Sequence, residues 1–87
     1  MIQAATAIAQ VSEDIAKVEC AIELVERQIA DVEEEISQLR RDKAEGWLQE
    51  VAMLREKERQ LREEKKQLRE KEKQLREKEL LLLGQGS

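Results

Sequence analysis

Residues 8–39 read IAQVSEDIAKVECAIELVERQIADVEEEISQL, and this stretch decides the fold. Apolar residues recur in it at alternating intervals of three and four. A mean spacing of 3.5 residues is typical of the buried seam of a coiled coil, whose heptad is written a to g with a and d apolar. Isoleucine takes position a, and valine or leucine takes position d. The seam residues are Ile8, Val11, Ile15, Val18, Ile22, Val25, Ile29, Val32, Ile36 and Leu39. This pattern predicts a long helix that packs against another helix.

A second heptad pattern occupies the other half of the chain. From Leu54 the sequence reads LREKERQ, LREEKKQ, LREKEKQ and LREKELL. With leucine at d, position a holds Val51 and then charged residues, so this helix offers only half a seam. Arginine at e would face mostly lysine at g in a parallel pair of such helices, which disfavours self-pairing of this segment. The d positions are Trp47, Leu54, Leu61, Leu68, Leu75 and Leu82, and the charged a positions are Glu58, Lys65, Glu72 and Glu79.

Composition and charge agree with a helical, two-part chain. Charged residues make up 41% of the 87 residues, and there is one aromatic residue and no proline. Such a composition with a 3.5-residue period is typical of long helices rather than of a globular core. Residues 1–40 carry nine acidic and three basic side chains, net −6, whereas residues 41–87 carry eleven acidic and thirteen basic ones, net +2. The two halves are therefore expected to attract each other.

The seams of the two halves are out of phase, because Leu39 and Trp47 are separated by eight residues rather than seven. Between them, Asp42 and Glu45 resemble a capping box, and Gly46 is typical of a helix end. We therefore predict an all-α fold, a long antiparallel helical hairpin. Its parts are an acidic helix over 1–41, a turn over 42–46, a leucine-heptad helix over 47–83 and a disordered tail over 84–87. The alternative is one continuous helix of about 80 residues, which would be about 120 Å long.

An antiparallel register supports the hairpin. If partner residue numbers sum to 90, Leu39 meets Val51 and each remaining isoleucine meets a leucine. The flanking charges then attract one another, although exposed pairs contribute only about 0.2–1 kcal/mol each and so select register more than they stabilise. The layers are Leu39 with Val51, Ile36 with Leu54, Ile29 with Leu61, Ile22 with Leu68, Ile15 with Leu75 and Ile8 with Leu82. The flank pairs are Glu33 with Arg55, Glu26 with Arg62, Glu19 with Arg69, Glu35 with Lys57 and Asp14 with Lys78.

Four of the ten layers in this register set a valine against a charged residue, as in Val32 with Glu58. Long side chains can lie along valine while their charged ends reach water, but the seam of a lone hairpin is then incomplete. The first helix also has a second apolar edge, formed by Ala9, Ala16, Ala21, Leu24 and Ala30. We therefore expect a partner, most simply a second copy in a four-helix arrangement, or another helical protein.

The residues offer little for catalysis or ligand binding. There is no histidine, no second cysteine beside Cys20 and no glycine-rich phosphate loop. The sequence therefore predicts no enzyme, no metal, no cofactor and no small-molecule ligand. Nucleic-acid binding is disfavoured because acidic residues interleave with the basic ones and the net charge is −4. No stretch approaches the roughly 20 apolar residues of a membrane span, and the N-terminus lacks the basic and apolar regions of a signal peptide. Cys20, at position f between acidic neighbours, is expected to be an exposed, unreactive thiol.

Residues Leu61–Leu83, LREEKKQLREKEKQLREKELLLL, resemble the coiled-coil segments of Crinkler-type effector proteins of oomycetes and some fungi. In those proteins similar runs end in a leucine cluster and follow an acidic Ile/Val-rich helix, as Ile15 to Leu39 would here. The family's N-terminal translocation motif and C-terminal toxic domain have no counterpart in this chain. The resemblance thus implies a connecting or oligomerising segment of a larger host-directed protein, and it implies no catalytic residue.

From these patterns we expect a structural coiled-coil interaction or oligomerisation module. It would bury the Ile/Val seam, and its flanking charges would set the register. Two alternatives stay open at this point. One is a continuous helix that forms an intermolecular coiled coil within a larger effector or scaffold protein. The other is a charged helix that binds a polyanion.

Overall fold

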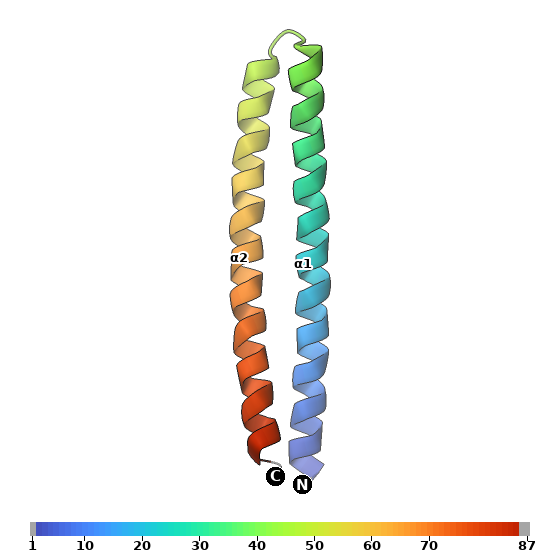
Figure 1. The fold of residues 1–87 in the computed structure, drawn as a ribbon, viewed down its shortest axis with the longest axis vertical. Coiled ribbons are helices and arrows are strands. Elements are labelled where there is room, and N and C mark those ends of the chain that lie inside the picture. The colour runs from blue at the N-terminus through green and yellow to red at the C-terminus, as the bar shows by residue number, and fades with distance from the viewer. Residues whose placement is uncertain (1, 86–87) are drawn as a thin grey trace. The chain divides into compact units, whose positions relative to one another are not determined.

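The computed structural model describes residues 2–85, and the side chains of residues 5–84. It contains helix α1, Ile2–Asp42, and helix α2, Trp47–Gln85, joined by a short turn (Figure 1). The prediction of an all-α helical hairpin is confirmed, and the alternative of one continuous helix is wrong. Helix α1 ends one residue later than predicted. Helix α2 includes Gly84 and Gln85, which the prediction assigned to a disordered tail, and the rest of that tail lies outside the described residues.

The chain divides into two compact units. The turn unit comprises residues 23–66, with the end of α1, the turn and the start of α2. The terminal unit comprises residues 2–22 of α1 and 67–85 of α2. In each unit one segment of α1 packs against one segment of α2, and the units are described separately below.

The turn is built by two residues with left-handed backbone conformation, Lys43 with φ 47° and Gly46 with φ 80°. Lys43 follows the last residue of α1 and caps the helix, because its N–H donates to the carbonyl of Leu39 at 2.8 Å, as in an αL motif. Gly46 immediately precedes α2, and its carbonyl accepts from the N–H of Glu50 at 3.2 Å. The predicted roles therefore change: Asp42 is the last helical residue of α1 rather than the start of a capping box, and Gly46 precedes a helix rather than ending one.

The core of the turn unit lies between the two helices near the turn. Val32, Ile36 and Val51 are buried there and form one cluster. Leu39 of α1 and Trp47, Leu54 and Leu61 of α2 are partly buried against it. Val25 and Ile29 are also buried. The out-of-phase seams of the sequence therefore meet because the turn brings Trp47 and Val51 back onto the end of α1.

The core of the terminal unit is supplied almost entirely by α1. Val11, Ile15, Val18 and Ile22 are buried, and Ile8 is half-buried. The facing leucines of α2 are only half-buried: Leu68, Leu75 and Leu82. This imbalance follows from the sequence, because α2 offers one apolar residue per heptad and α1 offers two.

The charged a positions of α2 lie against the seam with their ends near solvent. The side chains of Glu58 and Lys65 in the turn unit are 16% and 28% exposed, and that of Glu72 in the terminal unit is 20% exposed. Glu79 is also half-buried. Their aliphatic parts can cover the valines, so no charge has to be buried without water or a partner. A charged residue at position a of α2 shields the facing valine from water less completely than a leucine at that position would.

Candidate interaction surfaces

One flank of the turn unit, at position e of both helices, is closed by ion pairs. Arg62 of α2 places its guanidinium Nη2 2.7 Å from the Glu33 carboxylate of α1 and 3.7 Å from Glu58 of its own helix. Lys65 lies 3.9 Å from Glu26 on the same flank. We call this flank of each unit the bridged side. The side chains of Arg62 and Glu33 are both more than a third exposed. Their ion pair therefore contributes only about 0.2–1 kcal/mol to the stability of the fold.

The terminal unit has a bridged side of the same design. Arg76 of α2 contacts the Glu19 carboxylate of α1 at 2.6 Å and lies 3.7 Å from Glu72. The hydroxyl of Ser12 donates to the Glu79 carboxylate at 3.2 Å. In both units, therefore, an arginine at e joins a glutamate at e of α1 to the half-buried glutamate at a of its own helix.

The partners on the bridged side differ from those predicted from the sequence. Glu33 contacts Arg62 rather than Arg55, and Glu19 contacts Arg76 rather than Arg69. Each observed arginine stands one heptad later in α2 than the predicted one. The reason is the tilt of helical side chains toward the N-terminus of their own helix. In an antiparallel pair the side chains of the two helices lean in opposite directions along the hairpin. The two residues whose side chains meet therefore have residue numbers with a larger sum than two residues whose backbones lie directly opposite each other.

On the other flank, at position g, no ion pair joins the two helices among the described residues. The predicted pairs Glu35 with Lys57 and Asp14 with Lys78 do not form ion pairs among the described residues. Asp14 instead accepts a hydrogen bond from the Gln10 amide at 3.1 Å within α1. We call this flank of each unit the open side, because its grooves expose the apolar layers.

Grooves on the open side are lined by residues of both helices. In the terminal unit a groove of about 310 Å³ is lined by the buried Val18, the half-buried Leu68 and Leu75, and the small residue Ala21. In the turn unit a groove of about 200 Å³ is lined by the buried Val32 and the half-buried Leu61, with Glu35 and Lys57 beside them. The half-buried leucines of α2 line both grooves, and no arginine bridges the helices there among the described residues.

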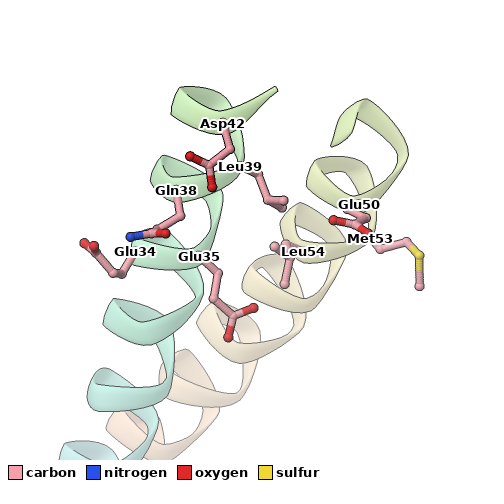
Figure 2. A pocket seen from close by; sticks show the side chains of 8 residues that line it. All are labelled: Glu34, Glu35, Gln38, Leu39, Asp42, Glu50, Met53 and Leu54. Carbon is pink, nitrogen blue, oxygen red and sulfur yellow. The ribbon is translucent and has the colours of Figure 1, made fainter. Parts of the chain in front are cut away.

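A third groove, of about 630 Å³, lies on the open side of the turn unit next to the turn. Figure 2 shows Leu39 and Leu54 pointing between the helices, with Met53 at the outer edge of α2. Met53 is 73% exposed. Carboxylates surround this apolar floor, from Glu34, Glu35 and Asp42 of α1 and Glu50 of α2. We call it the turn-end groove.

Met53 and Glu50 were not predicted from the sequence as groove residues, although their heptad positions indicate that they lie on this flank. Met53 is at position c and Glu50 at position g of α2, on the flank where no arginine occurs. Of the predicted second apolar edge of α1, Ala9, Ala16 and Ala30 are exposed, Leu24 is 55% exposed, and Ala21 lines the terminal groove. Cys20 is exposed, and it has no second cysteine to pair with.

No helix within residues 2–85 is long and apolar enough to cross a membrane. Comparison of the chain with protein-family models, with curated proteins and with solved structures found no match.

Proposed function

We propose that this chain is a coiled-coil interaction module that self-associates by covering the open side of its hairpin with a helix of a second copy. One observation carries this proposal. In each unit the bridged side is closed by arginine, whereas the open side leaves apolar seam residues accessible in grooves.

The distribution of burial supports the same function. Of the nine apolar side chains that are buried among residues 5–84, eight belong to α1 and one, Val51, belongs to α2. The leucines of α2 therefore keep apolar surface that a further helix would remove from water, and fully burying one leucine contributes about 1.5–3 kcal/mol. A second copy is the simplest source of such a helix, and two-fold dimers are the commonest oligomers of soluble proteins.

The test is the mass of the protein in solution, measured by light scattering and sedimentation equilibrium over a range of concentrations. Ala21→Arg places a long cationic side chain in the terminal groove beside Lys17 and Lys71 without replacing a seam residue. Ala16→Arg is the matched control, because it makes the same change at an exposed position of the same segment.

We expect the parent and Ala16→Arg to form dimers or larger species and Ala21→Arg to shift toward the monomer at unchanged helical circular dichroism. A parent protein that is monomeric at every concentration, or two variants that associate equally, would contradict the proposal.

The resemblance of Leu61–Leu83 to Crinkler-type segments adds a proposal about the parent protein. In that setting the module would connect or oligomerise parts of a larger, host-directed chain. Fusing this chain to a monomeric reporter protein tests this role. A fusion protein that stays monomeric would argue against it.

A further inference from the structure

The turn-end groove combines an apolar floor with a rim of four carboxylates. Glu35, Asp42 and Glu50 make no ion pair or hydrogen bond through their side chains with any described residue. Only Glu34 is near a cation, Arg41 at 3.6 Å. The accessible thioether of Met53 adapts readily to different apolar shapes. The groove therefore suits an apolar side chain that has a cation close to it.

In the terminal unit, α2 carries a row of residues that combines an apolar side chain with nearby cations, and we call this row the Leu81 stripe. Positions g and c of α2 hold Lys71, Gln74, Lys78 and Leu81, at intervals of three, four and three residues. Such residues share one face of a helix. The stripe includes no acidic residue, and Leu81 is 68% exposed. Lys78 makes no ion pair among the described residues, so its ammonium group is available to another molecule.

We propose that the turn-end groove of one copy binds the Leu81 stripe of a second copy. Leu81 packs on Leu39, Leu54 and Met53, and the Lys78 ammonium lies near the rim carboxylates. Burial of the leucine supplies affinity, and the complementary charges orient the stripe and favour it over an acidic helix. This inference rests on the proposed self-association and names the contact that produces it.

The test compares two adjacent substitutions. Leu81 and Leu80 are equally exposed, at 68%, but Leu80 is at position b, on the other side of the helix from the stripe. Leu81→Asp loses the apolar contact and adds a charge that the acidic rim repels, so we expect self-association to weaken by about tenfold or more. Leu80→Asp should leave the dissociation constant within about twofold of the parent, since it adds the same charge away from the contact. Equal weakening by the two variants would overturn the inference.

Cross-linking locates the contact independently. In a Cys20→Ser background, two single-cysteine variants, Met53→Cys and Leu81→Cys, are mixed and oxidised, and mixed disulfides are counted by mass spectrometry. The control replaces Met53→Cys by Gln60→Cys, which occupies the same heptad position one heptad away. We expect the Met53 pair to cross-link several-fold faster than the Gln60 pair. Similar rates in a protein that light scattering shows to be a dimer would overturn this contact while leaving self-association intact. A monomeric Cys20→Ser parent would instead contradict the proposed function itself.

Discussion

The guanidinium of Arg62 lies 2.7 Å from the carboxylate of Glu33 on the facing helix and 3.7 Å from Glu58 one turn back on its own helix. Arg76 makes the same two kinds of contact, with Glu19 and Glu72. Both arginines hold a half-buried glutamate in place while they bridge the helices. The bridged side is therefore a repeated device, and its absence from the open side gives the hairpin two different flanks.

The first prediction concerns these bridges. Arg62→Glu sets a carboxylate against both Glu33 and Glu58, whereas Arg55→Glu changes a residue that makes no ion pair among the described residues. We expect Arg62→Glu to lower the free energy of unfolding by about 1 kcal/mol more than Arg55→Glu does, since each exposed pair is worth about 0.2–1 kcal/mol and like charges cost similar amounts. Urea denaturation at low salt measures the difference, and added salt should reduce it.

Rescue is the control for this prediction. Adding Glu33→Arg to Arg62→Glu should recover part of the lost stability, while adding it to Arg55→Glu should not. If the Arg55 combination were rescued instead, the observed pairing of Arg62 with Glu33 would be wrong.

The sequence was sufficient to predict the hairpin, because the 3.5-residue period identified the seam and the phase break identified the turn. It was not sufficient to predict the partner of Glu33. That choice depends on the opposite tilt of side chains in antiparallel helices, which residue-level counting ignores. The role of Gly46 was also missed, because glycine with positive φ can either end a helix or precede one, and only the hydrogen bonds to Leu39 and from Glu50 distinguish the two.

The second prediction tests the seam. Ile22 is only 6% exposed, so Ile22→Asp would bury an unpaired carboxylate and should lower stability by several kcal/mol, enough to unfold much of the chain. Gln28→Asp adds the same side chain at an exposed position of α1 and should cost less than about 1 kcal/mol. Thermal melting followed by circular dichroism compares them. Equal losses would show that Ile22 is not part of a packed core.

The third prediction concerns the half-buried charges of α2. Glu58→Leu replaces a side chain that is 16% exposed and lies in the core layer of α2, so it should stabilise the hairpin. A gain of about 1 kcal/mol is expected, because the added apolar burial exceeds the loss of one surface ion pair to Arg62. Glu63→Leu, at an exposed position, should change stability little. Greater stability from Glu63→Leu than from Glu58→Leu, in chemical denaturation, would argue against the assigned layers.

The fourth prediction concerns proton binding at an exposed pair. The hydrogen bonds that Arg59 donates to Glu56, at 2.6 and 3.1 Å, lower the pKa of Glu56. A lowered folded-state pKa means that the pair favours the folded state above the ordinary pKa of glutamate, and that this contribution is lost as pH falls through the lowered value. Carboxyl NMR titration should show Glu56 protonating below the ordinary pH for glutamate, and Arg59→Gln should return its pKa upward. An unchanged Glu56 titration in Arg59→Gln would exclude this cause.

The last prediction concerns the turn. Lys43 has φ 47°, a conformation that costs an L-residue roughly 1–2 kcal/mol and costs glycine almost nothing. Lys43→Gly should therefore stabilise the hairpin, by up to about 1 kcal/mol after the greater flexibility of glycine in the unfolded chain is subtracted. Gly46→Ala is the opposite test. A Cβ at Gly46 would meet no atom within 4 Å, so its cost would come only from φ 80° and should be about 1 kcal/mol. Because both residues are exposed, neither change alters the core, and urea denaturation reports the backbone effect directly. Destabilisation by Lys43→Gly together with a neutral Gly46→Ala would mean that the turn does not adopt these two left-handed conformations.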